Sequence, residues 1–277
     1  MLALLYCKDA GRDRQSCLPH FCSILLACLF TAQAWSAELD HAPWDALIRK
    51  HVNAQACVDY RRWKAEDIPA LDTYLGSLAA PWPTHLSALE HKAASINAYN
   101  ALVIRWILTQ YPTKSIWKSK KPFATPRHIV NGKKVSLDDI ENGLRDLGDP
   151  RVHAVLVCAA RSCPPLRREA YTAARLDEQM DSNARAWLAN PALNRFFPDR
   201  KTAEISSIFD WFKADFQRNG GTVEQFLARF APAEKAAFLK QGKVKLKYID
   251  YHWGLNDTTL GADYSKAGFL WDWTRNR

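Results

Sequence analysis

Apolar side chains recur at helical spacing along much of the chain. The clearest case is the segment 91–110, where apolar positions repeat every three or four residues and Tyr111-Pro112 follows as a stop signal. The same pattern predicts further helices over 44–60, 69–80, 136–147, 176–188, 207–216 and 222–230. Ser136, with Asp139 three residues later, predicts a capping box at the start of one of them.

Three other segments predict β-strands. Residues 129–135 contain Asn131-Gly132, which supplies the positive φ angles of a tight hairpin turn. Residues 152–158 are almost continuously apolar, which indicates a buried strand. Residues 243–252 alternate, with lysines on the wet face. We therefore expect an α+β fold that is mostly helical, with a small antiparallel or mixed sheet built from these three segments.

The N-terminus has the pattern of a targeting signal. A basic start precedes an apolar stretch over 21–30, and Ala32-Gln33-Ala34 then has the small-x-small pattern of a signal-peptidase site. We expect a signal peptide over 1–34 and a periplasmic or secreted mature protein. The alternative is a lipoprotein anchored at Cys28, which ends a lipobox-like Leu25-Leu26-Ala27-Cys28.

The remaining length suits one globular domain over 38–256, followed by a C-terminal tail over 257–277. No transmembrane helix is expected after removal of the signal peptide. Among the cysteines, Cys57, Cys158 and Cys163 remain in the mature chain. In an oxidising compartment this odd number implies either one pair and one thiol, or three free thiols.

Composition excludes several protein classes. With 48% hydrophobic and 24% charged residues, the chain is neither disordered nor a multi-span membrane protein. Lysine and arginine exceed aspartate and glutamate by 38 − 29 = 9. The lysines of 243–247 form one short face with no aromatic platform, so we predict no nucleic-acid partner. Nucleotide-binding, zincin and α/β-hydrolase motifs are absent from the sequence, and we predict no cofactor and no metal.

The candidate chemistry lies between His153 and Pro165. Pro164-Pro165 is able to begin a helix, which would place the Cys163 thiol near a helix N-terminus, and arginines lie close by in the sequence. Both features favour a reactive thiolate, with His153 as general base. Two alternatives stay open: Cys158 and Cys163 form a small disulfide, and His153 is a core histidine. A regular strand would also place His153 and Cys158 on opposite faces.

Other polar residues are candidates for orienting or binding a substrate. Asn97 and Asn100 lie on the apolar side of a helix and need hydrogen-bond partners, either in a buried network or around His153 and a substrate amide. Glu141 and Arg145, four residues apart, are expected to pair as support. We add Cys158, Ser162 and His252 to these candidates, because His252 continues the inward face of the last predicted strand.

The chain resembles the family known as domain of unknown function 547 over about 96–256. The residues that carry this resemblance are Ile96-Asn97, Asn100, 136–145, 149–153, Cys158, 162–164, 208–216 and 251–256. Family members carry aspartate where this chain has His252, and the resemblance implies no particular reaction. A looser resemblance in element order links the chain to papain-like and transglutaminase-like folds, which place the nucleophilic cysteine at the start of the core helix. Here that neighbourhood holds Asn97.

These observations predict an exported thiol-dependent hydrolase or transferase that acts on amide or peptide-like bonds. Cys163 is the expected nucleophile and His153 the expected base, and the partner is a small-molecule or peptide-like ligand. The alternative is a non-catalytic periplasmic binding or scaffold domain, in which Cys158–Cys163 is a structural disulfide.

Overall fold

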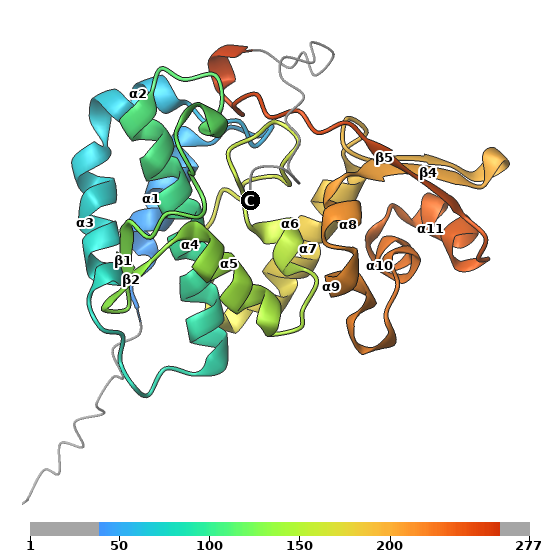
Figure 1. The fold of residues 1–277 in the computed structure, drawn as a ribbon, viewed down its shortest axis with the longest axis horizontal. Helices are drawn as coiled ribbons and strands as arrows, with labels where there is room; N and C mark the ends of the chain where they lie inside the picture. Colours follow the sequence, from blue (N-terminus) through green and yellow to red (C-terminus); the bar gives the residue numbers. More distant parts are fainter. Residues whose placement is uncertain (1–38, 261–277) are drawn as a thin grey trace, which may run out of the picture. The chain divides into compact units, whose positions relative to one another are not determined.

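A helical layer forms the first part of the structure, a computed structural model that describes residues 39–260. The predicted signal peptide, including Cys28, and the chain from 261 onward lie outside these residues. The first helices are α1 (Ala42–His51), α2 (Tyr60–Glu66), α3 (Ile68–Ala79) and α4 (Ala88–Gln110). Helix α4 packs against α2, α3 and α5 (Leu137–Asp146), so it forms the centre of this layer (Figure 1).

Helix α4 confirms the strongest helix prediction and begins three residues earlier than expected. The Ser87 side chain accepts a hydrogen bond from the Glu90 backbone N–H, and the Glu90 carboxylate accepts one from the Ser87 backbone N–H, which completes a capping box. The helix ends at Gln110, and Tyr111 caps it before Pro112, as predicted. Most of its residues are buried, because other elements pack around nearly its whole circumference.

The helix predicted over 44–60 is shorter in the structure, and a loop follows it. The segment 44–60 breaks after α1, and Val52 and Val58 form an antiparallel bridge that closes the loop between α1 and α2. The Asp59 side chain then accepts a hydrogen bond from Arg62 N–H and begins α2. The prediction was wrong after α1 because the apolar spacing continues into a loop. The backbone hydrogen bonds of that loop close a turn and do not continue the helix.

The predicted hairpin is confirmed. Strands β1 (His128–Val130) and β2 (Lys133–Val135) pair antiparallel. The two turn residues, Asn131 and Gly132, have φ angles of 51° and 69°. A Cβ atom at Gly132 would lie 3.2 Å from Cγ of Pro81. Ser136 and Asp139 form the predicted capping box at the start of α5.

The segment 152–158 is not a strand. Residues Val152–Val155 form the single-turn helix α6, and residues 156–158 continue as extended chain without a sheet partner. The apolar run is buried, as expected, but side chains from other helices satisfy its backbone. Asn100 and Asn183 bond the carbonyl oxygens of Val155 and Ala154. A short apolar run does not distinguish a strand from a buried helical turn by periodicity alone, which explains the error.

An ion network fixes the start of α6. Asp149 accepts hydrogen bonds from Lys92 Nζ at 2.6 Å and from Arg151, whose guanidinium also reaches Asp181 at 2.6 Å. Burial alone would raise the pKa of Asp149, but the hydrogen bonds and charges of Arg151 and Lys92 outweigh it and lower that pKa to about 2. Since Lys92 belongs to α4 and Asp181 to α7 (Leu176–Ala189), the network ties three helices together.

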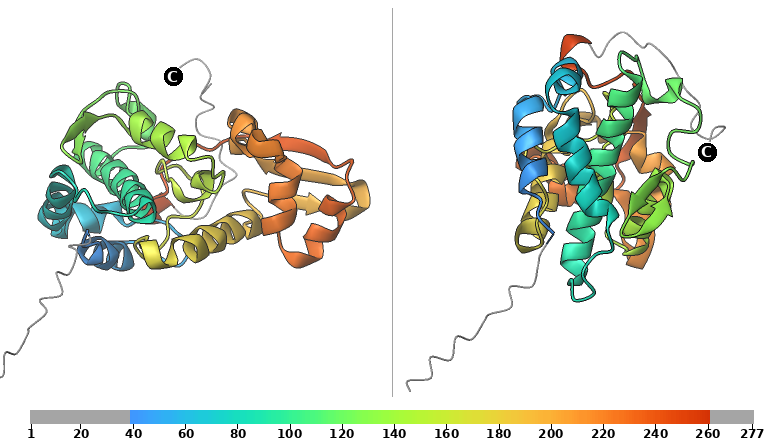
Figure 2. Two further views of the ribbon diagram at one scale, coloured as in Figure 1. Left: turned by 90° about the horizontal axis from the view of Figure 1, so that it is seen from below. Right: turned by 90° about the vertical axis from the view of Figure 1, so that its left-hand side faces the viewer.

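Helix α7 confirms its prediction and connects the helical layer to a second sheet. It packs against α6 at one end and α10 at the other (Figure 2). The sheet has the order β3-β4-β5, with β3 and β4 antiparallel and β4 and β5 parallel. Its strands are β3 (Arg195–Phe197), β4 (Thr202–Ser206) and β5 (Lys245–Ile249).

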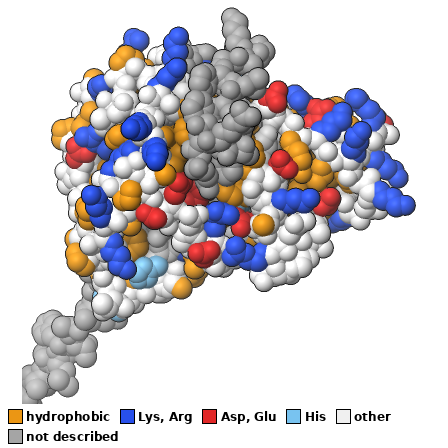
Figure 3. Space-filling model, in the orientation of Figure 1, with side chains coloured by type: hydrophobic (Ala, Val, Ile, Leu, Met, Phe, Trp, Pro, Cys, Tyr) orange, Lys and Arg blue, Asp and Glu red, His pale blue; other side chains and the backbone are white. Residues whose placement is uncertain are grey.

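The α+β class, mostly helical, is confirmed, but the predicted single sheet was wrong. The hairpin is a sheet of its own, and β5 pairs with β4, which was not predicted. The predicted wet face of β5 is present, because Lys243, Lys245 and Lys247 are exposed. Figure 3 shows lysine and arginine side chains gathered over this end, where Figure 1 labels β4 and β5.

The helices around this sheet are short. They are α8 (Ile208–Trp211), α9 (Lys213–Gln217), α10 (Val223–Phe230) and α11 (Ala233–Lys240). The predicted helix 207–216 is therefore interrupted at Phe212, whereas the helix beginning after Thr222 is confirmed and α11 was not predicted. The remaining 3₁₀ turns are Ile116–Lys118, Ala173–Arg175, Pro198–Arg200, Arg218–Gly220 and Thr258–Leu260. Within residues 39–260, no helix is both long enough and apolar enough to cross a membrane.

Candidate functional site

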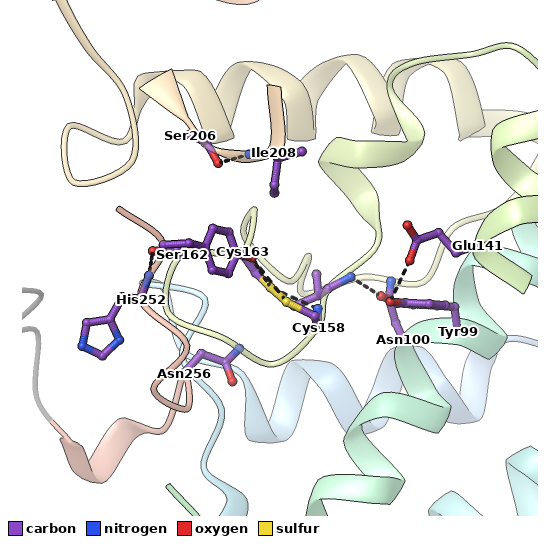
Figure 4. The surroundings of a disulfide bond; sticks show 12 residues. Tyr99, Asn100, Glu141, Cys158, Ser162, Cys163, Ser206, Ile208, His252 and Asn256 are labelled. Atoms are coloured by element: carbon purple, nitrogen blue, oxygen red, sulfur yellow. Dashed lines mark hydrogen bonds between the residues drawn. A yellow bond between two sulfur atoms is a disulfide. The ribbon is translucent and has the colours of Figure 1, made fainter. Parts of the chain in front are cut away.

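The sulfur atoms of Cys158 and Cys163 are bonded as a disulfide in the loop after α6 (Figure 4). Cys163 is 5% exposed, and Cys158 is half-buried. The backbone N–H of Cys158 donates to Cys163 Sγ at 3.0 Å, and the Tyr251 hydroxyl lies 3.2 Å from the same sulfur. Two donors therefore face Cys163 Sγ, and donors of this kind would stabilise a thiolate there after reduction.

The loop that carries Cys163 is held by the segment after β5. Ala160 and Leu255 form a bridge, and Arg161 N–H donates to the Gly254 carbonyl at 2.8 Å. The Ser162 hydroxyl accepts a hydrogen bond from the His252 backbone N–H at 2.8 Å. These contacts explain how Tyr251, far along the sequence, reaches the sulfur atoms.

A buried histidine–aspartate pair lies close to the disulfide loop. His153 Nε2 and Asp215 Oδ2 are 2.8 Å apart, and both side chains are almost fully buried. Asp215 also accepts hydrogen bonds from Arg145 at 2.6 Å and from Arg218 at 3.2 Å. Burial alone would raise the pKa of Asp215, but the hydrogen bonds and charges of His153 and Arg145 outweigh it and hold the pKa well below the usual aspartate range. Asp215 is therefore a carboxylate that orients the imidazole.

A cavity of about 60 Å³ joins these groups. Cys158, Cys163, His153 and Glu141 all line it, so four of the predicted site residues lie around one cavity. The rest of the wall is aromatic and aliphatic: Tyr99, Phe123, Leu156, Pro164, Ile208, Trp211, Phe212, Tyr251 and Trp253. Because 152–155 is helical, His153 and Cys158 do not lie on opposite sides, as the strand prediction required.

Both predicted asparagines bond backbone groups instead of facing this cavity. Asn97 donates to the Tyr171 carbonyl at 2.8 Å and accepts from the Tyr171 N–H at 2.9 Å. Asn100 donates to the Val155 carbonyl and accepts from the Val157 N–H, both at 2.9 Å. Each side chain thus satisfies a buried donor and a buried acceptor, and Asn100 fixes the chain that leads into Cys158.

The other predicted residues lie around the site without lining the cavity. Arg145 pairs with Asp215 and covers the Phe212 ring, with Cζ 4.7 Å from the ring centroid. Ser162 holds the backbone at His252, as described above. The His252 ring points away from the disulfide in Figure 4, and its Nδ1 accepts a hydrogen bond from Gly254 N–H at 3.0 Å.

The helix predicted to begin at Pro164-Pro165 does not form. Residues 164–172 have no regular structure, so no helix N-terminus faces Cys163. The nearby arginines have partners elsewhere: Arg161 Nε donates to the Leu255 carbonyl, and Arg167 pairs with Glu169. The donors described at Cys163 Sγ are the Cys158 N–H and the Tyr251 hydroxyl.

Sequence reasoning missed Asp215, Tyr251 and the tryptophans of the cavity wall. Their signal was present in the segments 208–216 and 251–256, which belong to the family resemblance, but their roles depend on long-range contacts. His153 and Asp215 are 62 residues apart in sequence, and Cys163 and Tyr251 are 88 residues apart.

The remaining cysteine lies beside the disulfide loop. Cys57 is a half-buried free thiol, and burial raises its pKa. A smaller cavity of about 30 Å³ is lined by Cys57, Arg161, Cys163 and Asn256, among others. For metals, no group of three or more His, Cys, Asp or Glu side chains in the described part of the chain is arranged to hold an ion.

Comparison with known proteins gives one match. A family model described as "Protein of unknown function, DUF547" matches residues 83–188. This match begins and ends earlier than the resemblance over 96–256 that the motifs suggest. No curated protein and no solved structure matches the chain.

Proposed function

Because this chain belongs to the DUF547 family through residues 83–188, we propose that it acts through the cysteine and histidine which that segment brings to the cavity. The proposed activity is a thiol-dependent hydrolase or transferase acting on amide or peptide-like bonds. Cys163 is the nucleophile and His153 the general base, while Asp215 orients the imidazole. The observation that carries the proposal is the His153–Asp215 pair, whose histidine lines the same cavity as Cys163.

The oxidised cysteine must first be released. An external dithiol exchanges with the disulfide: its two thiols become a disulfide, and Cys158 and Cys163 each gain a hydrogen atom. Cys158 is the more exposed of the two and is the sulfur that the dithiol attacks. Cys163 then leaves as a thiolate, which the Cys158 N–H and the Tyr251 hydroxyl stabilise.

The reaction of the reduced site follows from the roles of these groups. Nε2 of His153 bonds Asp215, so Nδ1 is the nitrogen that takes the Cys163 proton. The sulfur attacks the substrate carbonyl carbon, a C–S bond forms, and the C–N bond breaks as His153 returns the proton to the leaving amine. Water then cleaves the thioester in a hydrolase, and an acceptor amine does so in a transferase.

Export is part of the same proposal. The signal-peptide pattern over 1–34 supports a periplasmic or secreted protein, in which the disulfide is the resting state of the site. Reduction would then control activity.

The test uses p-nitrophenyl acetate as the acyl donor. We expect the reduced protein to release a burst of p-nitrophenolate and to carry an acetyl group on the peptide that contains Cys163, as seen by mass spectrometry. Cys158→Ser keeps Cys163 reduced and should retain the burst without a reductant. Cys163→Ser should abolish the burst, and His153→Gln should slow it about a hundredfold or more.

Cys57 provides an internal control, because burial raises the pKa of this thiol. Iodoacetamide labelling across pH should modify Cys163 faster than Cys57 near neutral pH. The proposal fails if Cys163 reacts no faster than Cys57, or if the acetyl burst survives in Cys163→Ser.

The second candidate is a scaffold domain, and the disulfide favours it. A disulfide across five positions stabilises a fold by about 2 kcal/mol through the unfolded chain. The asparagine contacts also fit a rigid domain. Under this alternative, freshly exported protein carries a complete Cys158–Cys163 bridge by non-reducing mass spectrometry, and the reduced protein gives no acetyl burst.

A further inference from the structure

The net positive charge of the chain is concentrated in one stretch of sequence. Residues 91–137 contain nine lysines and arginines and no aspartate or glutamate, and the rest of the chain sums to 9 − 9 = 0. Lys92 is paired with Asp149 within the helical layer. Arg105 is paired with Asp72. The other seven cations lie between α4 and α5, so the charge of this connection is not balanced along the sequence.

Most of these cations are lysines whose side chains face solvent. Lys120 and Lys121 lie in the loop after α4, and Lys133 and Lys134 begin β2. All four are exposed, and none forms an ion pair with a carboxylate of residues 39–260. Figure 3 shows several lysine and arginine side chains on the half of the molecule where Figure 1 draws the hairpin. These positive charges are therefore available to an external partner.

Arg127 holds the loop against the hairpin. Its Nη2 donates to the carbonyl oxygens of Lys120 at 3.3 Å and Lys121 at 2.9 Å. Its backbone N–H donates to the Val135 carbonyl at 3.2 Å, at the end of β2. The guanidinium lies 4.0 Å from the centroid of the Trp106 ring. Arg127 thus serves the fold, and the cations left at the surface of this segment are lysines.

One large apolar side chain is exposed beside these lysines. Ile129 is 47% exposed and lies directly opposite Lys134 in the hairpin register. Residues opposite each other in an antiparallel pair place their side chains on the same face, so Ile129 and Lys134 share one face of the hairpin. The next residue, Val130, is buried and faces the other way.

This combination fits an anionic lipid bilayer better than a nucleic acid. Lysine is a flexible point charge that suits a diffuse negative surface, whereas the planar fork of arginine suits individual phosphates and bases. Within residues 111–137, the large apolar side chain that is exposed is the aliphatic Ile129 and not an aromatic ring on which a base could stack. An aliphatic side chain is able to enter the boundary between head groups and acyl chains.

We propose that one surface of the protein, the basic surface, binds an anionic lipid bilayer. This surface consists of Lys120, Lys121, Ile129, Lys133 and Lys134. The lysines attract the head-group phosphates, and Ile129 enters the apolar boundary below them. Phe123, which lines the larger cavity, belongs to the same loop as Lys120 and Lys121, so docking would hold the candidate site close to the bilayer. The proposal stands whether or not Cys163 is catalytic.

The first test is co-sedimentation with lipid vesicles. Vesicles made of equal amounts of phosphatidylglycerol and phosphatidylcholine are compared with vesicles of phosphatidylcholine alone. The full chain is used for every protein, so the apolar stretch 21–30 is common to all of them. We expect the anionic vesicles to bind at least about a hundredfold more strongly, because each lysine near such a surface contributes about fivefold. Added salt should reduce this difference.

Charge removal at the hairpin has a matched control at the other end of the molecule. Lys133→Gln combined with Lys134→Gln should weaken binding to anionic vesicles about 25-fold. Lys243→Gln combined with Lys245→Gln removes the same charge at β5, which Figure 1 draws on the opposite side from the hairpin. This control should stay within about twofold of the unmodified protein, because those lysines would lie beyond the reach of the surface potential. An equal loss in both double variants overturns the proposal.

The apolar contribution has its own pair of variants. Ile129→Thr keeps a branched side chain on the strand and should weaken binding to anionic vesicles several-fold. Leu147→Thr removes a side chain that is 59% exposed after α5 and should leave binding unchanged. Unchanged binding by a folded Ile129→Thr protein would contradict insertion of this side chain and overturn the bilayer as the partner.

A second measurement needs no variant. Lysines of the unmodified protein are acetylated with N-hydroxysuccinimide acetate and located by mass spectrometry, with and without anionic vesicles. We expect the vesicles to slow acetylation of the four lysines of the basic surface and to leave Lys243 and Lys245 unchanged. Equal protection of both groups overturns the proposal. Protection by duplex DNA without protection by vesicles also overturns it and assigns the surface to nucleic acid.

Discussion

Replacing Asn100 tests how the disulfide loop is positioned. In Asn100→Ala, the Val155 carbonyl and the Val157 N–H both lose their partner, and both lie in a buried part of the chain. Each buried group left without a hydrogen bond costs about 1–3 kcal/mol, so the pair predicts a loss of about 2–6 kcal/mol in the free energy of unfolding. In a domain of this size, each kcal/mol lowers Tm by about 2–4 °C, so Tm should fall by at least about 4 °C.

The assay is urea and thermal unfolding followed by circular dichroism, with the disulfide intact in both proteins. Asn142→Ala is the matched control, because Asn142 is exposed and its side chain bonds only Arg145 in the contacts described for it. We expect that control to change the free energy of unfolding by less than about 0.5 kcal/mol. A loss in Asn100→Ala no larger than in the control would show that Asn100 does not hold the chain before Cys158.

Three further predictions test other contacts. The pKa of Asp149 is lowered from near 3.8 to about 2, so its ionised form stabilises the fold above pH 4. That stabilisation, about 2 kcal/mol, is lost as the pH falls toward 2. Acid unfolding of Asp149→Asn should therefore lack this part of the pH dependence. Gly132→Ala places a side chain at a positive φ and close to Pro81, so urea unfolding should show a loss of about 1 kcal/mol or more. Tyr251→Phe removes a donor to Cys163 Sγ, so iodoacetamide labelling of reduced Cys163 should shift to higher pH; an unchanged profile would exclude the hydroxyl from thiolate stabilisation.

Local signals in the sequence predicted local structure well. Ser136 with Asp139 and Asn131-Gly132 each act within a few residues, and both form the predicted cap or turn. The single-turn helix at Val152–Val155 was not predictable in this way. Its backbone is satisfied by asparagines on α4 and α7, and no pattern inside 152–158 records those partners.

The candidate site shows the same difference between what local residue types predict and what long-range contacts determine. His153, Cys158, Cys163 and Glu141 were identified because their residue types carry chemistry, and the structure brings all four to one cavity. Asp215 was not identified, since a carboxylate becomes an orienting group only through the residue that it contacts. The catalytic roles of Cys163 and His153 stay predictions, which the acetyl burst tests.

Residues from two parts of the chain line the cavity, so the segment that matches the family model does not form the whole site alone. Residues 83–188 supply the sulfur atoms, the imidazole and Glu141, whereas the orienting carboxylate of Asp215, the Tyr251 hydroxyl and the two tryptophans of the cavity wall come from later segments. Without those segments, His153 would lose its partner and the Cys163 sulfur would lose one of its two donors. The later segments therefore complete the arrangement that the proposed chemistry requires.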